Sequence, residues 1–173
     1  MTKDYKPQVV LVNKGNRKIG IEEKLKAHKK GKLHRAFSVF VFNPKGELLI
    51  QQRAKTKYHS GGLWSNTACS HPQPRETCNQ AAHKALIKEM GFDCKLKKAF
   101  NFIYRVDLQN GLTEYEYDCV FFGEFDGEPK PSHKEVMGYK WVSLRELRRD
   151  ITKKPKKYSA WFKIALEKII TNQ

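Results

Sequence analysis

Two pairs of polar residues, each with a single residue between its members, interrupt stretches of strand-like sequence. Cys69 and His71 form the first pair, within the run from Trp64 to Pro72, and Glu114 and Glu116 form the second, in an aromatic stretch further along. Residues two apart in an extended chain point to the same face. Each pair can therefore direct two reactive groups into one pocket. A thiol, an imidazole and two carboxylates suit acid–base chemistry, metal binding, or both.

The length and the cysteine content predict one intracellular domain. At 173 residues, the chain can bury roughly two thirds of its unfolded surface, and we expect a single domain over residues 1–173 with a core from about 9 to 170. The four cysteines lack the spacing of a disulfide framework or of a zinc ribbon. There is no apolar signal segment, and no run approaches the roughly 18 apolar residues needed to span a bilayer. We therefore expect free thiols in the cytoplasm, no membrane insertion, and a monomer or weak homodimer.

The chain is strongly basic, with 34 Lys and Arg against 18 Asp and Glu and a net charge of +16. This excess favours an anionic partner, which could be nucleic acid, acidic lipid or a phosphorylated small molecule. Much of it lies at 14–35 and 140–157, where the cations are mixed with apolar residues. No recognised nucleic-acid-binding motif is present, so a basic nucleic-acid-binding module is a remote alternative. We expect a solvated surface on which only a few cations contact a ligand.

The order of the predicted elements indicates an α+β fold. Strands are predicted at 9–12, 36–42, 48–52, 100–106 and 115–125 from their β-branched and aromatic content, with turns at 43–46 and 107–111. Helices are predicted to begin after Thr77, Ser143 and Ser159; Thr77 and Gln80 form a capping box, and Gly91 ends that helix. Strands in meander order with helices inserted late predict a mixed sheet flanked by helices.

A candidate metal site combines the two polar pairs with two further histidines. His28 and His34 lie on either side of a lysine-rich turn, and with His71, Glu114 and Glu116 they would supply three imidazoles and two carboxylates. Such a set suits Mn²⁺, Zn²⁺, Fe²⁺ or Mg²⁺ in a five- or six-coordinate site. A histidine on a basic loop is more often a surface residue, however, and a Glu-x-Glu pair in a strand more often faces solvent. The residues alone leave both interpretations open.

Four runs of sequence, in this order and at these separations, are similar to those of the type I isopentenyl diphosphate isomerases, members of the Nudix fold superfamily. The runs are Leu33–Ser38, Gln51–Lys55, Gly62–Pro72 and Glu114–Glu116. The most specific is W-(S/T)-N-x-x-C-x-H-P with a downstream E-x-E, and the resemblance extends from about Val9 to Trp161. It implies a Nudix-like mixed β-sheet sandwiched by helices. It also implies an enzyme of isoprenoid biosynthesis that isomerises isopentenyl diphosphate to dimethylallyl diphosphate.

This reaction moves a carbon–carbon double bond by one position, so it needs an acid and a base on opposite sides of a dry hydrocarbon slot. The resemblance implies that Cys69 and Glu116 form this pair, and either group could begin protonated. It further implies that the Tyr104 hydroxyl supports the acid. Trp161, together with Trp64, would face the carbocation with its π surface.

The resemblance also implies two divalent cations and a set of phosphate ligands. The first cation is Mn²⁺, Zn²⁺ or Mg²⁺ bound by the protein, through His28, His34, His71, Glu114 and Glu116. The second is Mg²⁺ accompanying the substrate diphosphate, with Glu89 and the backbone carbonyl of Cys69 as its ligands. The diphosphate oxygens would be bound by Lys24, Arg53 and Lys57.

Departures from the Nudix hydrolase pattern weaken the alternative of diphosphate hydrolysis. Of the carboxylates in that pattern only Glu76 and Glu89 survive, whereas Ala85 and Lys88 stand at two other positions. Their replacement removes negative charge that two or three hydrolytic metal ions require. Hydrolysis is therefore the weaker enzymatic hypothesis.

Two other features of the sequence bear on the site. Cys69 and His71 could instead be the nucleophile and base of a cysteine hydrolase, but same-face neighbours on one strand lie side by side, without the third orienting group that such sites use. His28 and His34 are separated by five residues, one fewer than in the bacterial isomerase pattern. The position of His28 is therefore the one that the resemblance constrains least.

Overall fold

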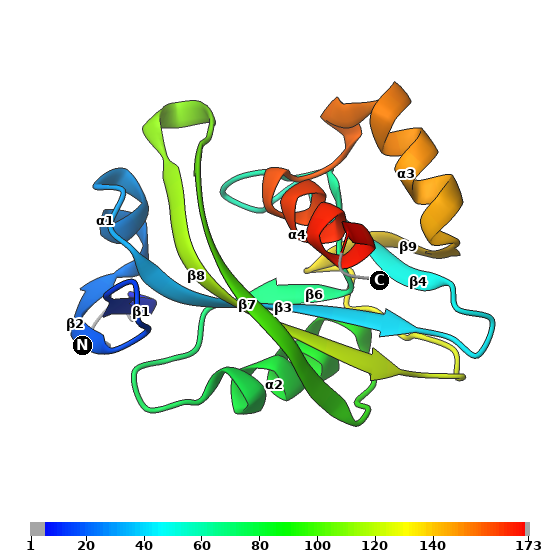
Figure 1. The fold of residues 1–173 in the computed structure, drawn as a ribbon, viewed down its shortest axis with the longest axis horizontal. Coiled ribbons are helices and arrows are strands. Elements are labelled where there is room, and N and C mark those ends of the chain that lie inside the picture. The colour runs from blue at the N-terminus through cyan, green and yellow to red at the C-terminus, as the bar shows by residue number, and fades with distance from the viewer. Residues whose placement is uncertain (1–5, 172–173) are drawn as a thin grey trace.

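The structure, a computed structural model, describes residues 6–171, which form a nine-stranded mixed sheet with helices on both faces (Figure 1). The strands are β1 (Gln8–Val12), β2 (Lys18–Glu23), β3 (His34–Phe42), β4 (Leu48–Arg53), β5 (Trp64–Ser65), β6 (Ala68–Ser70), β7 (Leu96–Asp107), β8 (Thr113–Glu124) and β9 (Val136–Val142). The helices are α1 (Lys24–Lys29), α2 (Cys78–Met90), α3 (Leu144–Lys153) and α4 (Ala160–Thr171), with short 3₁₀ turns at Gln109–Gly111 and Pro155–Lys157. The predicted α+β class is confirmed.

The central strand, β3, is not paired in the predicted meander order. It runs parallel to β8 along its whole length, from His34 opposite Glu116 to Phe42 opposite Glu124. Its other edge pairs with β1 and β6, and only Phe42 pairs with Leu48 of β4, the next strand in the chain. The meander prediction is therefore wrong here. Seven of the nine residues of β3 are buried, and the partners of a strand that is covered on both faces are selected by core packing, not by nearness in the chain.

Helices cover the two faces of the sheet with separate apolar layers. In Figure 1, α2 lies beneath the sheet, and α3 and α4 lie above it. From α2, Ala82, Leu86 and Met90 pack into the lower layer with Phe37 and Val39 of β3. The upper layer consists mainly of α4 residues packed on β3, β4, β7 and β8, among them Phe40, Ile50, Phe102, Phe162 and Leu166. Burial of each large apolar side chain stabilises the folded state by roughly 1.5–3 kcal/mol relative to leaving it exposed. The predicted sandwich of sheet and helices is confirmed.

The predicted helix boundaries are also confirmed. The Thr77 hydroxyl accepts a hydrogen bond from the Gln80 amide, the Gln80 side chain accepts one from the Thr77 amide, and Gly91 ends α2 with φ of +74°. Ser143 caps α3, and α4 begins directly after Ser159. The predicted hairpin of β7 and β8 is present as well. These features rest on short-range side-chain chemistry, which is why the sequence predicts them.

The sequence did not predict β2, α1, β5 or β9, and of β6 it predicted only that the segment around Cys69 and His71 is extended. β5 and β6 have only two and three residues, too few for periodicity to reveal. α1 is a six-residue helix whose N-cap has no side-chain hydrogen bond, so its lysine-rich sequence resembles a turn. Within residues 6–171, no helix combines the length and the apolar character needed to cross a membrane.

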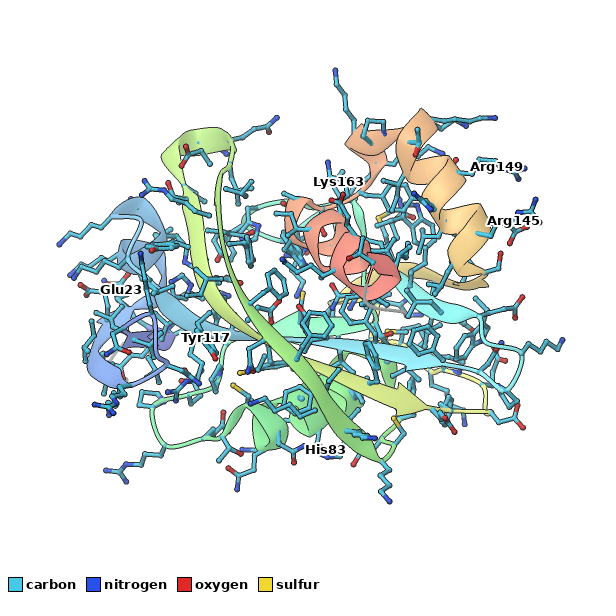
Figure 2. All side chains as sticks on the ribbon, viewed as in Figure 1. Glu23, His83, Tyr117, Arg145, Arg149 and Lys163 are labelled. Carbon is cyan, nitrogen blue, oxygen red and sulfur yellow. The ribbon has the colours of Figure 1, made fainter. Side chains whose placement is uncertain are left out.

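Charged side chains at the surface point into solvent, as the dispersed charge predicts. Arg145 and Arg149 project from α3 away from the sheet (Figure 2), and both are exposed. The same helix buries Leu147. The basic residues Arg145 and Arg149 therefore lie on the solvent-facing side of α3, and the opposite side of the helix buries Leu147.

Gly91 provides a test of how α2 is held against the following loop. Gly91 and Gly46 share the same φ of +74°, but a Cβ at Gly91 would overlap the Lys130 carbonyl, whereas a Cβ at Gly46 would meet nothing within 4 Å. We expect Gly46→Ala to lower the free energy of unfolding by about 1 kcal/mol, the cost of a left-handed non-glycine residue. Gly91→Ala should lower it by at least about 1–3 kcal/mol more, because the loop must shift. Urea denaturation of both variants measures the difference, and equal losses would contradict the tight contact.

Candidate active site

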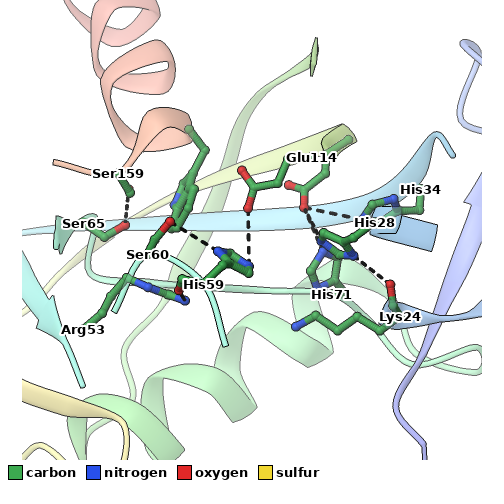
Figure 3. Close-up of polar contacts among 12 residues, drawn as sticks. Lys24, His28, His34, Arg53, His59, Ser60, Ser65, His71, Glu114 and Ser159 are labelled. Atoms are coloured by element: carbon green, nitrogen blue, oxygen red, sulfur yellow. Dashed lines mark hydrogen bonds and ion pairs between the residues drawn. The ribbon is translucent and has the colours of Figure 1, made fainter. Parts of the chain in front are cut away.

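A cavity of about 230 Å³ opens where β6, β7 and β8 meet the loop after β4 and the first turn of α4. Its lining includes most of the residues that the sequence predicts for the site, namely Lys24, Arg53, Lys57, Cys69, His71, Glu89, Tyr104, Glu114, Glu116 and Trp161. His28 and His34 lie behind this lining with no exposed surface. Figure 3 shows His28, His34 and His71 gathered close together beside the strands.

Strand register brings three polar residues into one row across the sheet. Tyr104 of β7 stands opposite Glu116 of β8, and Glu116 in turn stands opposite His34 of β3. On its other edge, β3 pairs with β6, where Ser38 stands opposite Cys69. The two polar pairs seen in the sequence therefore converge because their strands flank the same central strand.

Three imidazoles converge on one oxygen of Glu116. The Nε2 atoms of His71, His34 and His28 lie 2.8, 3.5 and 4.0 Å from Glu116 Oε1. The four side chains offer ligand atoms that all lie within 4.8 Å of one another. His28 thus joins the group despite the shorter turn between it and His34.

Backbone carbonyls fix the orientation of the two innermost imidazoles. His28 Nδ1 lies 2.8 Å from the Lys24 carbonyl, and His34 Nδ1 lies 2.7 Å from the Lys32 carbonyl. A carbonyl oxygen only accepts, so each Nδ1 carries the hydrogen and each Nε2 presents a lone pair to the site. Both Nε2 atoms are buried and have no hydrogen-bond partner. This arrangement fits a divalent cation, since metal-binding histidines usually donate their other ring hydrogen in this way.

Glu114 is separated from that group of four. One of its oxygens lies 3.6 Å from His59 Nε2 and the other 3.3 Å from the Tyr104 hydroxyl. It belongs with His28 and His59 to a second group of potential ligands. The five predicted ligands are thus brought together, but in two groups that share His28.

The two carboxyl groups are held in different protonation states. Burial, helped by the charge of Glu116, raises the pKa of Glu114 to about 9. Burial also opposes ionisation of Glu116, but His71, which hydrogen-bonds to it at 2.8 Å, outweighs burial and holds the pKa of Glu116 well below its usual range. The Tyr104 hydroxyl donates a 2.6 Å hydrogen bond to Glu116, which further favours the carboxylate. A neutral and an ionised carboxyl group side by side are typical of acid–base sites.

The Cys69 thiol and the imidazoles of His28, His59 and His71 are uncharged near neutral pH. Burial raises the pKa of Cys69 to about 12, so its thiol keeps its proton. Burial lowers the pKa of His28 to about 4 and that of His59 to about 3. The pKa of His71 is also lowered, again chiefly by burial. Cys69 therefore carries a proton that it can donate, and the neutral imidazoles of His28, His59 and His71 can bind metal.

The three predicted phosphate ligands, Lys24, Arg53 and Lys57, line the cavity. Arg53 is largely buried, and its guanidinium lies 5.0 Å from the centre of the Trp161 ring. Burial lowers the pKa of Lys24, whose ammonium lies 5.1 Å from the centre of the Tyr58 ring. Lys57 forms an ion pair with Glu135. The structure thus brings three cations to the walls of one cavity, where they can contact an anion.

The two predicted tryptophans differ in placement. Trp161 lines the cavity, and its indole NH donates a 3.2 Å hydrogen bond to Asn66. Trp64 does not line the cavity; its ring packs beneath the Lys140 ammonium at 4.8 Å. Side chains alternate along a strand, and the next residue, Ser65, points to Ser159 at 3.0 Å. The structure therefore does not bring Trp64 to the cavity.

Glu89 reaches the cavity from α2. Its carboxylate accepts a 2.7 Å hydrogen bond from the Gln51 side chain, and burial raises its pKa. It is not part of either group of close ligand atoms among residues 6–171. If Glu89 binds Mg²⁺ as predicted, this ion would lie in a different part of the cavity from the imidazoles.

Sequence reasoning missed His59 and Asp118. His59 lines the cavity, and Asp118 is buried behind it, where it accepts a 2.7 Å hydrogen bond from Ser38. Asp118 follows Glu116 at the same i,i+2 spacing, so extending the Glu-x-Glu pattern by one step could have identified it. His59 is a lone histidine in a loop, and the only local signal is the Gly61-Gly62 pair after it.

Comparison with known proteins gives the same family throughout. The model of the NUDIX domain matches residues 32–162. Isopentenyl-diphosphate Delta-isomerase 2 of Photorhabdus laumondii is 55% identical over 155 residues, which cover 90% of this chain and 88% of the relative. The protein of the same name from Aromatoleum aromaticum is 50% identical over 164 residues, which cover 95% of this chain and 87% of the relative.

Solved structures share the fold at low sequence identity. A crystal structure of a Deinococcus radiodurans protein matches with a TM-score of 0.71 at 18% identity and covers 85% of this chain and 90% of that one. The MutT protein of Methanosarcina mazei matches with a TM-score of 0.67 at 19% identity and covers 81% and 94%. These likenesses establish the fold alone.

The buried imidazoles predict how stability depends on pH. The folded protein holds His28 neutral down to about pH 4, whereas the unfolded chain binds a proton near pH 6.5. We therefore expect the free energy of unfolding of chelator-treated protein to fall as pH decreases from about 6.5 to 4, by up to about 1.4 kcal/mol per pH unit for each such proton. His28→Gln should remove the contribution of one proton, up to about 1.4 kcal/mol per pH unit, from this slope. Urea denaturation between pH 8 and pH 4 measures it, and an unchanged slope in the variant would contradict the buried neutral imidazole.

Proposed function

The chain belongs to the isopentenyl-diphosphate Delta-isomerase family, within the NUDIX domain fold, and on this premise we propose that it converts isopentenyl diphosphate to dimethylallyl diphosphate. The observation that carries the proposal is that the Cys69 thiol and the Glu116 carboxylate line the same cavity in complementary protonation states. The reaction needs one group that donates a proton and another that accepts one. The four free thiols of the chain also accord with a reducing cytoplasm as the place of action.

In this mechanism, Cys69 donates its proton to the terminal alkene carbon of the substrate. The tertiary carbocation that results then loses a proton from the CH₂ group between the cationic carbon and the carbon that bears the diphosphate, and Glu116 accepts this proton. The transfers leave a thiolate and a neutral carboxyl group, and proton exchange between the site and water restores both. Tyr104 holds Glu116 in place through its 2.6 Å hydrogen bond, and the Trp161 ring faces the cavity, where it can stabilise positive charge by roughly 0.5–2 kcal/mol.

The donor set supports a divalent cation beside Glu116, which we propose to be Mn²⁺, Zn²⁺ or Mg²⁺. His28, His34, His71 and Glu116 would hold it, with Glu114 at the edge of the set. When bound, such a cation withdraws charge from the Glu116 carboxylate and fixes which oxygen exchanges the proton. The carbonyls of Lys24 and Lys32 orient two of these imidazoles by accepting their Nδ1 hydrogens.

The diphosphate is proposed to lie at the basic side of the cavity. Lys24, Arg53 and Lys57 would bind its oxygens, and Glu89 with the Cys69 carbonyl would hold an accompanying Mg²⁺. Hydrolysis of the same substrate has less support. Ala85 is buried in the apolar layer under the sheet, and Lys88 forms an ion pair with Glu135 at 2.7 Å, so neither supplies a carboxylate for hydrolytic metal ions.

Proton NMR in D₂O with Mg²⁺ and Mn²⁺ tests the proposed reaction directly. Isopentenyl diphosphate should give dimethylallyl diphosphate that carries deuterium in a methyl group, because the added proton exchanges with solvent. Phosphate release is followed in the same tube. Free phosphate or isopentenyl monophosphate would instead establish hydrolysis, and an unchanged substrate would exclude both activities.

Substitution of the proposed acid and base should abolish turnover. We expect Cys69→Ala and Glu116→Gln each to reduce kcat by at least about 100-fold, since a positioned proton donor or acceptor contributes 10²–10⁴-fold. Cys94→Ala, which removes a free thiol outside the cavity, is the matched control and should retain activity. Circular dichroism checks that each variant folds. If Cys69→Ala retained more than a few per cent of wild-type activity, the assigned pair would be wrong.

A further inference from the structure

His59 reaches the cavity wall without a role in the mechanism above. Its side chain is only 9% exposed, and its ring meets that of Trp161 edge to face at 5.7 Å. Its Nε2 lies 3.6 Å from Glu114 Oε1 (Figure 3). An imidazole buried between an indole and a carboxyl group is in the position of a ligand, not of a surface residue.

The loop that carries His59 is held in a conformation that directs this side chain inward. Ser60 has φ of +52°, a left-handed conformation that costs a non-glycine residue about 1 kcal/mol or more. A Cβ at Gly61 would lie 2.6 Å from the Lys55 carbonyl oxygen, so only glycine fits there. Arg53 secures the loop, since its guanidinium donates to the His59 carbonyl at 3.3 Å and its own carbonyl accepts from the Gly62 amide at 2.9 Å. Strain that the surrounding structure maintains is typical of functional loops.

His59, His28 and Glu114 offer ligand atoms that lie within 4.8 Å of one another. The other group consists of His28, His34, His71 and Glu116. His28 is the one residue that the two groups share. The Nε2 of His28 is buried without a hydrogen-bond partner, and its Nδ1 hydrogen is directed to the Lys24 carbonyl. The lone pair of His28 Nε2 is therefore available to the other ligands of either group.

We propose that His59, His28 and Glu114 form a second seat for a divalent transition-metal ion, next to the seat formed by His28, His34, His71 and Glu116. Two imidazoles and one carboxylate suit Zn²⁺, Fe²⁺ or Co²⁺ better than Mg²⁺ or Ca²⁺, which prefer oxygen ligands. The Nε2 of His28 has a single lone pair, so the two seats hold one ion at a time. The inference deepens the proposed function, because it rests on a divalent ion being bound beside Glu116.

Co²⁺ binding to variants of each seat tests this proposal without an activity assay. His34→Ala removes a ligand of the first seat only, and His59→Ala removes a ligand of the second seat only. Chelator-treated protein is titrated with Co²⁺ in a calorimeter and by visible absorption. Wild type and both single variants should each bind one Co²⁺ per chain. The double variant H34A/H59A should bind at least about twofold more weakly than H34A, because it has lost the second of two seats that compete for one ion and keeps only His28, His71 and Glu116 of the first.

The matched control is H34A/H83A, in which the histidine removed lies on the outer side of α2 and pairs with Asp93. It should bind Co²⁺ as H34A does. Equal affinities of H34A/H59A and H34A/H83A would overturn the proposal, and so would two Co²⁺ ions per wild-type chain. If circular dichroism shows that H34A is unfolded, His71→Ala, which also removes a ligand of the first seat only, replaces it in the same series. A protein that passes this test but leaves isopentenyl diphosphate unchanged would refute the proposed function and not the second seat.

Discussion

The parallel pairing of β3 with β8 is the constraint on which the site depends. It places His34 beside Glu116, and the β7–β8 hairpin then places Tyr104 on the other side of the same glutamate. Because β3 also pairs with β6, Cys69 and His71 are brought to the region where β8 begins. A shift of one residue in the β3–β8 register would turn Glu116 to the opposite face of the sheet. The apolar layers on both faces prevent that shift, since it would also reverse every buried side chain of β8.

Burial of so many polar groups at one point is costly to the fold. Unpartnered Nε2 atoms of His28 and His34 and a neutral Glu114 are groups that water would solvate better. The surrounding structure limits this cost by giving His28 and His34 each a backbone acceptor and by giving Glu116 a hydroxyl donor. The same arrangement leaves lone pairs directed at one place, which is what a divalent cation requires. Structure and proposed chemistry thus follow from the same desolvated cluster.

The potential metal ligands of this chain lie at other positions of the NUDIX fold than the Nudix hydrolase sequence pattern predicts. The Nudix hydrolase sequence pattern would place carboxylates at two positions of α2 where this chain has Ala85, which faces the apolar layer, and Lys88, which pairs with Glu135. Only Glu89 remains directed at the cavity, and it is held by Gln51. The main cluster of potential ligands lies instead on α1, β3, β8 and the segment after β6. One fold can therefore carry different reactions, because the reaction is decided by a few side chains.

The sequence by itself determined the features that depend on short-range chemistry. Caps at Thr77 and Ser143, the hairpin of β7 and β8, and the shared face of Cys69 and His71 all follow from residues a few positions apart, and the motifs around these residues indicated the family. Only the tertiary structure decided that β3 pairs with β8, that Glu114 and Glu116 join different groups, that His59 enters the cavity and that Trp64 does not. The reason is that these relations join residues far apart in the chain, or depend on which way a short strand or loop turns its side chains. Core packing and strand register decide both, and no local pattern in the sequence records them.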